Sequence, residues 1–566
     1  MPFTPAVAEQ RFVLDHVVGL DSIAASDRFA AASPDTVDAV LEGVGDFAAG
    51  EWAPLLREGD VNGPKWSPDG VTMPPGYPAA YRAYVEGGWG TIGSPEAFGG
   101  QGLPFVLATA VLETLGTANM GFALAPTLTV GAIEALLHHG TPEQQAEYLP
   151  KLATGEWTGT MNLTEPQAGS DVGALRTRAV PAVGGGWSIK GTKIYISFGD
   201  HDLADNIVHL VLARTPDAPA GTRGISLFLV PKVRRDGSAN DVRTVSIEHK
   251  MGLHASPTCV LAFGDHDDCI GELIGGEGGG MRAMFTMMNN ARLNVGLQGV
   301  QVAEAATQKA VEYARERIQS ARAGGPHRDP VAIIEHPDVR RMLMRMKAQT
   351  QAARALVYAA AAQVDRAALG LPQAQDRLEI LTPLAKAHGT DLGCEVASIG
   401  VQVHGGMGFI EETGAAQFYR DARITPIYEG TNGIQAADLV GRKLSLSNGA
   451  AFASLIADLK AEAQDAGLIT LIDACEDIGR RLQGADTDDR LAASYPFLTM
   501  LSVATCGVLM EREGRAATGD DDFAQAKRAV TTFYVAQLVP EALGLRAAAQ
   551  APASQLYALE AAAFAA

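Results

Sequence analysis

Cysteine is scarce in this sequence, with five residues among 566, and no two of them have Cys-x-x-Cys spacing. They are Cys259, Cys269, Cys394, Cys475 and Cys506. This spacing offers no cysteine-based metal site, and a few scattered thiols are typical of a reducing compartment. We therefore expect no bound metal, and cysteines that are buried as small apolar side chains.

Long apolar runs are also lacking. No stretch reaches the roughly 18 consecutive apolar residues that indicate a membrane-spanning helix. Residues 1–20 carry Glu9, Arg11 and Asp15 among their apolar positions, which leaves no uninterrupted signal-peptide core. The sequence therefore predicts a cytoplasmic protein without a membrane span.

Positive charge is in deficit, since 45 Lys and Arg face 65 Asp and Glu and the formal net charge is −20. Such a balance opposes binding to nucleic acid or to an anionic membrane through a general electrostatic field. A polyanionic ligand would have to be bound by local basic or amide-rich sites.

The hydrophobic pattern changes along the chain. Residues 36–155 show mainly helical spacing, and Thr141 followed by Pro142 is a typical helix start. Residues 160–274 instead contain short apolar runs bounded by Gly, Pro and Asp, for example 207–212 and 225–230. Strands in a compact β domain are expected there.

The glycine-rich run 275–280 (GGEGGG) ends the β segment. It lacks the spacing of a dinucleotide fingerprint or a P-loop, so we interpret it as a connecting turn. Long periodic segments at 289–319, 337–368 and 383–403 then favour a helix bundle. A linker is expected at 445–449.

The last 120 or so residues read as further helices, with 16 acidic against 9 basic residues after Ser447. We expect them to bury Leu455, Leu459, Phe497 and Leu501 as a separate layer. The whole pattern predicts an α+β multidomain chain. Its expected domains are an N-terminal helical domain 1–158, a central β domain 159–275, a helical bundle 276–445 and an additional helical domain 446–566.

Three sequence blocks carry the chemical signal. The run 427–435 (IYEGTNGIQ) places one carboxylate beside a glycine, where the backbone can approach a ligand closely. Upstream lie 163–171 (LTEPQAGSD) and 191–197 (GTKIYIS). In this order and spacing the blocks resemble the acyl-CoA dehydrogenase family, flavoenzymes that desaturate acyl-CoA thioesters between the α and β carbons.

The resemblance implies a fold and a reaction. The family fold is an N-terminal helical domain, a central β barrel and a C-terminal four-helix bundle, and here an extra C-terminal helical domain follows. The runs 201–208 (HDLADNIV), 248–252 (EHKMG) and 433–439 (GIQAADL) look like the extended branch that includes the 3-methylmercaptopropionyl-CoA dehydrogenases. The resemblance implies FAD as cofactor, an electron-transfer flavoprotein as acceptor, and a homodimer or homotetramer.

Glu429 is the expected catalytic base, because removing the weakly acidic α-proton of a thioester requires an aligned carboxylate. Read alone, a glutamate before glycine is more often a solvated residue at a helix end. Some relatives place the base instead at the position of Ala291, and alanine cannot take a proton. Arg292 resembles an arginine that supports the acyl-CoA cavity, with a helix salt bridge as the alternative, and Gly430 is expected to contact substrate.

The resemblance also assigns flavin contacts. Leu163 and Thr164 match residues at the isoalloxazine edge, while Gly169 and Ser170 match contacts to the pyrophosphate or the coenzyme A arm. Tyr195 and Ser197 match residues that pack on the ring and bond near its N5. Tryptophan and threonine are more frequent at those last two positions.

A second flavin-binding group is implied for a neighbouring subunit. Arg317 and Gln319 resemble residues that reach its FAD pyrophosphate, although Ser320 replaces a common phenylalanine. The other half of that site matches Gln402, Gly405, Gly406 and Thr431. Gly433 stands where several relatives have glutamine, so that contact is missing.

Two other functions remain open on the same fold. An acyl-CoA oxidase would pass electrons to oxygen, and a non-catalytic flavin-binding protein would associate through the added helices. The sequence has no His-Glu-x-x-His spacing and no Gly-x-Ser-x-Gly elbow, which argues against metal and serine hydrolases.

Overall fold

The computed structural model describes residues 3–326 and 328–565, apart from the side chain of Asn289. The chain forms two compact units. Unit 1 contains residues 3–41 and everything from Arg292 onward, and unit 2 contains residues 42–291. Two helices, α3 (Pro34–Phe47) and α8 (Gly280–Glu316), contribute residues to both units.

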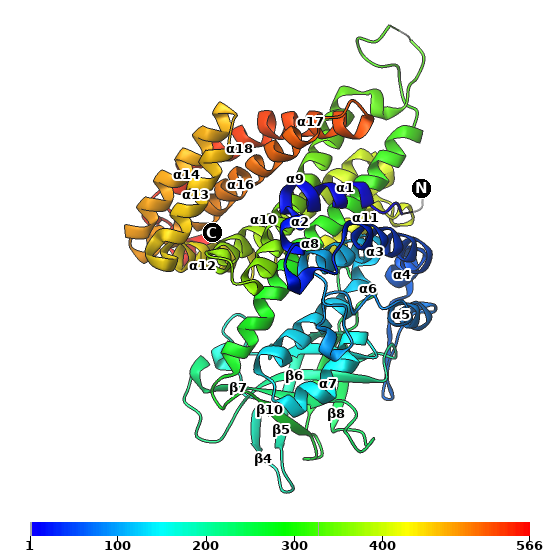
Figure 1. The fold of residues 1–566 in the computed structure, drawn as a ribbon, viewed down its shortest axis with the longest axis vertical. Coiled ribbons are helices and arrows are strands. Elements are labelled where there is room, and N and C mark those ends of the chain that lie inside the picture. Colours follow the sequence, from blue (N-terminus) through cyan, green and yellow to red (C-terminus); the bar gives the residue numbers. More distant parts are fainter. Residues whose placement is uncertain (1–2, 327, 566) are drawn as a thin grey trace. The chain divides into compact units, whose positions relative to one another are not determined.

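Unit 2 begins with helices and ends with strands, as the sequence predicts (Figure 1). Thr141 accepts a hydrogen bond from the backbone N–H of Gln144, whose side chain bonds back to Thr141. This capping box confirms the helix start expected at Pro142. The helical elements are α4 (Leu56–Asn62), α5 (Tyr77–Glu86), α6 (Phe105–His139) and α7 (Pro142–Thr154), with the small hairpin β1 (Lys65–Ser67) and β2 (Gly70–Thr72).

The long helix α6 is strongly apolar. Among the described residues it alone has the length and mean hydropathy, 1.6, of a membrane-spanning helix, and 72% of its most apolar window is buried inside the protein. Its backbone breaks at Asn119, whose side-chain oxygen accepts from the N–H of Phe122. The side chain thus replaces a hydrogen bond that the break removes.

Eight strands form the β domain. They are β3 (Trp157–Asn162), β4 (Arg178–Pro181), β5 (Trp187–Ser197), β6 (Asn206–Arg214), β7 (Ile225–Pro231), β8 (Val242–Ile247), β9 (Thr258–Phe263) and β10 (Ile270–Ile274). The hydrogen-bonded order is β10-β7-β6-β4-β5-β9-β8, with β3 parallel to β6. Because β10 also pairs with β5, part of the sheet closes on itself, as in a barrel.

Alternation along the central strands separates two cores. On β6, Leu210 and Leu212 pack with residues of α6 and α7, while Val211 and Ala213 pack with the interior of the sheet. β7 divides its side chains in the same way. Successive side chains of a strand point to opposite faces, so both faces of these strands are buried and their sequence is continuously apolar.

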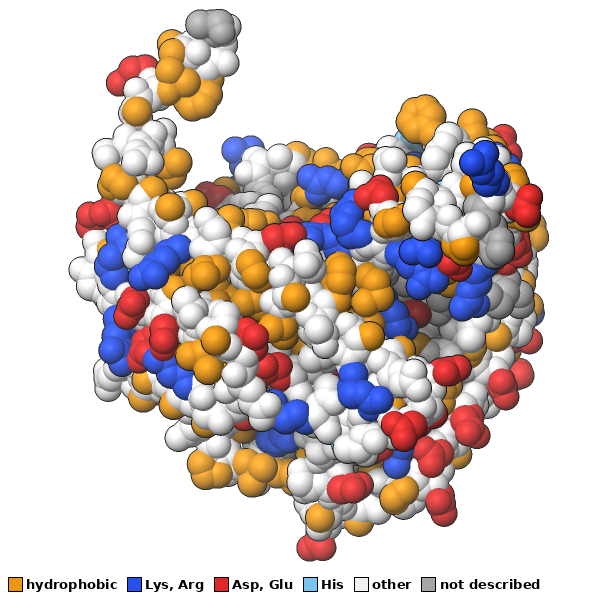
Figure 2. All heavy atoms as spheres, turned by 90° about the horizontal axis from the view of Figure 1, so that it is seen from above, with side chains coloured by type: hydrophobic (Ala, Val, Ile, Leu, Met, Phe, Trp, Pro, Cys, Tyr) orange, Lys and Arg blue, Asp and Glu red, His pale blue; other side chains and the backbone are white. Residues whose placement is uncertain are grey.

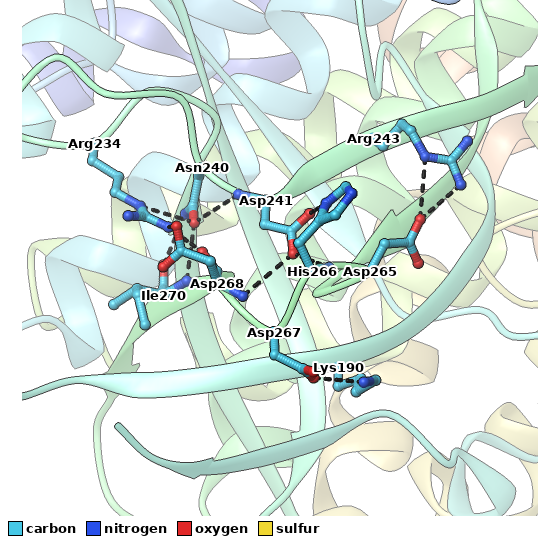
Figure 3. Close-up of polar contacts among 10 residues, drawn as sticks. All are labelled: Lys190, Arg234, Asn240, Asp241, Arg243, Asp265, His266, Asp267, Asp268 and Ile270. Carbon is cyan, nitrogen blue, oxygen red and sulfur yellow. Dashed lines mark hydrogen bonds and ion pairs between the residues drawn. The ribbon is translucent and has the colours of Figure 1, made fainter. Parts of the chain in front are cut away.

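The loop between β9 and β10 is acidic and is held by ion pairs (Figure 3). Asp265 pairs with Arg243 at 2.7 Å and Asp267 with Lys190 at 2.5 Å. The carboxylate of Asp241 accepts a backbone hydrogen bond from this loop, at His266. The acidic cluster is therefore a structural element of the rim of the β domain.

Unit 1 is helical throughout its longer segments. Its elements are α1 (Val7–Val13), α2 (Leu20–Ala24), α9 (Pro337–Ala368), α10 (Ala374–Val403), α11 (Ala415–Ala422), α12 (Asn432–Gly441), α13 (Ala450–Glu462), α14 (Ala466–Gly484), α15 (Thr487–Ala492), α16 (Ser494–Ala516), α17 (Asp522–Phe533), α18 (Val539–Leu543) and α19 (Arg546–Gln550). The helix α9 has the bounds that the sequence predicts. The helix predicted at 383–403 is wrong at its start, because α10 begins at Ala374 and contains Pro383.

The C-terminal helices pack on the bundle within unit 1. Helix α16 contacts α9, α10 and α12 (Figure 1). Leu455, Leu459, Phe497 and Leu501 are buried as expected. The connector at 443–449 turns through left-handed residues Ser447 and Asn448, so the linker expected at 445–449 is a tight turn.

The surface carries mixed charge. On the face drawn in Figure 2, Lys and Arg side chains are interspersed with Asp and Glu. The net charge of −20 is therefore not gathered into one acidic patch on that face.

Candidate active site

Glu429 lies in a tight turn directly before α12. Its φ is +55° and that of Gly430 is +84°. A left-handed backbone is unusual for a residue with a side chain and persists only where the surroundings fix it. Thr431 then caps α12, since its hydroxyl accepts from the N–H of Ile434 at 3.2 Å.

Gln435 supports this turn from the first turn of α12. Its Nε2 donates to the carbonyl oxygens of Glu429 at 3.4 Å and Gly430 at 3.3 Å. A Cβ at position 430 would lie 2.9 Å from that nitrogen. Glycine is therefore required there both for its conformation and for space.

Asn432 anchors the same turn to helix α10. Its Oδ1 accepts from Lys386 Nζ at 2.9 Å, and its Nδ2 donates to Asp391 Oδ1 at 2.8 Å and to Thr390 Oγ1 at 2.9 Å. Asn432 and Lys386 are both buried. Because each of these side-chain contacts comes from α10, the position of Glu429 depends on that helix.

The electrostatic surroundings favour a protonatable carboxyl at Glu429. Burial raises its pKa above the usual range, and the nearby cations Arg292 and Lys386 lower it by less. Burial also lowers the pKa of Lys386 to about 8, against the opposing effect of Asp391. A raised carboxyl pKa is what a base needs if it is to hold a proton after removing it.

Arg292 is buried and forms an ion pair with Asp438 at 3.5 Å. Asp438 also binds Arg442, at 2.5 Å. The salt-bridge interpretation of Arg292 therefore has a structural partner. Within the described part of the chain the Nε of Arg292 has no hydrogen-bond partner, which leaves a donor for a ligand.

In unit 2 a buried ion pair organises the loop that carries Leu163 and Thr164. Lys193 Nζ donates to Glu165 at 2.9 Å and to the carbonyl of Leu163 at 3.0 Å. Burial would raise the pKa of Glu165, but Lys193 and further hydrogen bonds lower it to about 2. The N–H of Ile194 donates to the carbonyl of Thr164, so the loop is fastened to β5.

Tyr195 and Ser197 follow on β5, next to that loop. The register of β5 with β9 shifts between Lys193 and Ile196, and Tyr195 at this bulge has a φ of +60°. The bulge leaves the aromatic side chain of Tyr195 60% exposed. Gly169 and Ser170 are exposed too, and a Cβ at Gly169 would meet no atom within 4 Å.

The second predicted flavin group lies at one end of unit 1. The rings of Tyr313 and His404 stack with centroids 4.4 Å apart, which joins the end of α8 to the end of α10. Arg317 and Gln319 are exposed just after α8. Exposed Gln402, Gly405 and Gly406 lie at the end of α10, where Cβ atoms on both glycines would meet nothing.

The residues present fit a flavin dinucleotide. Unit 2 offers an uncovered aromatic ring, hydroxyls and an open glycine, which suit an isoalloxazine ring and phosphate. Unit 1 offers an exposed arginine and two open glycines, which suit a pyrophosphate. The Thr431 hydroxyl accepts the capping hydrogen bond of α12, and its own O–H is still a possible donor to phosphate.

Sequence reasoning missed the supporting residues. Glu165, Lys193, Asn432 and Gln435 all lie inside the three blocks that drew attention to the site, but only their burial reveals their role. Lys386 lies in the middle of α10 and has no motif of its own.

Four family models match the chain. They are the acyl-CoA dehydrogenase N-terminal domain at residues 34–156, the middle domain at 160–266, the C-terminal domain at 278–444, and the acetyl-CoA dehydrogenase C-terminal-like domain at 441–560.

The comparisons with individual proteins agree with these matches. The chain is 44% identical to 3-methylmercaptopropionyl-CoA dehydrogenase of Ruegeria pomeroyi, over 96% of this chain and 97% of the relative. A chain in a structure of the electron transferring flavoprotein of Acidaminococcus fermentans is 30% identical, with a TM-score of 0.62 over 73% of this chain and 99% of that one.

A third comparison extends to the added helices. An acyl-CoA dehydrogenase of Bacillus anthracis complexed with FAD shares the fold, with a TM-score of 0.73 and 24% identity over 92% of this chain and 88% of that one. The predicted fold is confirmed, with N-terminal helical, middle sheet, C-terminal helical and extra C-terminal domains. The chain belongs to the acyl-CoA dehydrogenase family, the FAD-binding oxidoreductases that act on CH–CH bonds.

Proposed function

We propose that Glu429 is the base that starts α,β-desaturation of an acyl-CoA to its trans-2-enoyl-CoA. The carboxylate takes the proton from the α carbon, and the hydride leaves the β carbon. FAD supplies the hydride acceptor when it is bound. The observation that carries the proposal is the carboxyl of Glu429, which has a raised pKa and lies in a backbone conformation that Gln435 and Asn432 hold in place.

The chain's other residues have supporting roles in this proposal. Arg292 and Gly430 border Glu429 in unit 1, and Ser170 is the expected contact to the coenzyme A arm in unit 2. Arg292 also keeps the carboxylate form accessible, because a nearby cation limits how far burial raises the pKa of Glu429. Alanine at position 291 leaves Glu429 without a competing base.

Glu429→Gln tests the assignment, because glutamine keeps the shape but has no useful proton affinity. The variant should bind FAD and acyl-CoA while anaerobic flavin reduction slows by at least about 10²–10⁴-fold, the contribution of a positioned base. Exposed Glu412→Gln is the matched control and should reduce at the wild-type rate. Reduction of Glu429→Gln within about tenfold of wild type would refute Glu429 as the base.

We propose an electron-transfer flavoprotein as the electron acceptor, supported by the similarity to a chain in the A. fermentans structure. The rival acyl-CoA oxidase would instead produce hydrogen peroxide steadily under air. A non-catalytic flavoprotein would show no flavin bleaching with any acyl-CoA.

The acyl group is best sought with a graded series. Bleaching of the bound flavin should be measured with straight-chain acyl-CoAs of increasing length and with 3-methylmercaptopropionyl-CoA. The R. pomeroyi relative is named after this last compound. We propose the thioether substrate as the first to test because the identity to that relative covers nearly the whole chain.

A further inference from the structure

The added C-terminal helices contact the anchor of the Glu429 turn through the side chain of Tyr495. Tyr495, in the first turn of α16, donates its hydroxyl to Asp391 Oδ2 at 2.6 Å. Asp391 lies on α10, more than one hundred residues earlier in the chain. The contact therefore joins the additional helical domain to the bundle at one defined atom.

Asp391 divides its two oxygens between Tyr495 and the catalytic turn. Its Oδ1 accepts from Asn432 Nδ2 at 2.8 Å, while Oδ2 accepts from Tyr495. Asn432 in turn holds Lys386 Nζ at 2.9 Å. When one oxygen of a carboxylate is held by a hydrogen bond, the other oxygen points in a defined direction. Tyr495 therefore orients the Asp391 carboxylate that binds Asn432.

The position of the turn around Glu429 depends on the hydrogen bonds that Asn432 makes. The N–H of Asn432 donates to the carbonyl of Pro426 at 3.0 Å, which closes the turn around Glu429. The left-handed backbone at Glu429 would relax if this support loosened. A shift of the carboxylate by a fraction of an ångström changes its alignment with a bound α carbon.

We propose that Tyr495 is a positioning residue for Glu429, acting through Asp391 and Asn432, so that the added C-terminal domain sets the rate of α-proton removal. The inference rests on the proposed function of Glu429. It assigns to the C-terminal addition a part in the reaction besides its packing role.

Tyr495→Phe is a mild test, because it removes only a hydroxyl from a side chain that is 39% exposed. The limiting rate of anaerobic flavin reduction should fall by about 3–30-fold, within the roughly 10²-fold that misplacement by 1 Å can cost. The acyl-CoA concentration at half-maximal rate should stay within about twofold, because binding is not the affected step. Butyryl-CoA and 3-methylmercaptopropionyl-CoA serve as probes, and the rate is measured per bound flavin.

A double-mutant cycle separates positioning from general loss of stability. Asp391→Asn should slow reduction at least as much as Tyr495→Phe, and the double variant should be no slower than Asp391→Asn alone, because both act through one contact. Tyr148→Phe is the matched control, since Tyr148 donates to Glu272 at 3.0 Å in unit 2, and its rate should equal that of wild type.

Two outcomes would overturn the inference. One is a limiting rate for Tyr495→Phe within about twofold of wild type, and the other is independent, multiplicative losses in the double variant. Glu429→Gln identifies which proposal has failed. If that variant is inactive while Tyr495→Phe is normal, only the positioning role is wrong, whereas normal reduction by Glu429→Gln removes the proposed function itself.

Discussion

The backbone at Glu429 stores conformational energy at the site of the reaction. A non-glycine residue in the left-handed region costs on the order of 1–3 kcal/mol, and it is retained where the surrounding structure over-determines it. Here two amides, Gln435 and Asn432, hold the turn. The same pattern occurs in unit 2, where Tyr195 is left-handed beside the Glu165–Lys193 pair.

Lys193→Met should destabilise the protein and weaken FAD binding. The ammonium and the Glu165 carboxylate are both buried, with exposed fractions of 0% and 3%. Removing one partner of a buried pair leaves an uncompensated charge, and the expected loss is about 3–5 kcal/mol in urea unfolding.

Lys190→Met on the same strand is the control for this loss. Its side chain is 63% exposed and pairs with Asp267 at the surface, where ion pairs contribute little. Equal stability of the two variants would show that the buried pair does not hold the Leu163–Thr164 loop.

At the residue scale the sequence points to candidate ligand-facing groups but not to the residues that hold them in place. A glutamate before glycine can be recognised as a candidate base from its neighbours along the chain. Lys386 and Asp391 cannot, because their role comes from α10 lying beneath α12. Such contacts depend on how the helices pack, and the spacing of residues along a single sequence does not predict that packing.

At the element scale the helices with clear ends were predicted best. His336 and Pro337 start α9, and proline at the first helical position is favourable. The start of α10 was misplaced because proline usually begins a helix, whereas Pro383 lies inside α10. The helix continues there because Pro383 is buried among packed neighbours, and tertiary contacts outweigh the loss of one backbone hydrogen bond.

The segment after α8 extends away from the helices of unit 1 (Figure 1). The N–H of Gln319 donates to Val331 at 3.0 Å and that of Ile333 to Arg317 at 2.8 Å, which pairs the two arms of the loop. Arg317 is exposed where the two arms of the loop are hydrogen-bonded, a position that suits contact with another molecule.

Arg317→Ala should lower FAD occupancy, because we expect this arginine to bind the cofactor pyrophosphate of a neighbouring subunit. The flavin-to-protein absorbance ratio and the mass under native conditions measure both parts of the prediction. Arg315→Ala, on the last turn of α8, is the control and should keep its flavin. A wild-type protein that is monomeric at micromolar concentration with full FAD would rule out the inter-subunit assignment.

On the scale of the whole molecule, unit 1 is joined by a buried charge cluster. Lys527 of α17 binds both Glu513 of α16 and Glu9 of α1. Glu9 also faces Arg354 of α9, which pairs with Glu304 of α8 at 2.8 Å. Three carboxylates thus share two cations.

Burial, opposed by Lys527 and reinforced by Glu9, raises the pKa of Glu513 from 4.5 to about 7. The folded protein therefore holds this proton between about pH 4.5 and 7, where the unfolded chain releases it. The contribution of Glu513 to stability must fall as the pH rises through that window.

Glu513→Gln should flatten this pH dependence, since an amide keeps an oxygen for Lys527 but does not titrate. The unfolding free energy should fall less between about pH 5 and 8 in the variant than in wild type. Exposed Asp520→Asn should follow the wild-type profile. Parallel profiles for Glu513→Gln and wild type would contradict the assignment of the proton to this carboxyl.

The contact between Glu9 and Lys527 spans 518 residues of sequence, which has a consequence for synthesis on the ribosome. At about 5–20 residues per second, the first helix waits roughly 25–100 s for its charged partner to be made. Residues 42–291 form their own compact unit and can fold during that interval. The ring of Phe12 on α1 stays without its edge-on partner Phe523 until that residue has been made, so this nascent helix is a natural client for a chaperone.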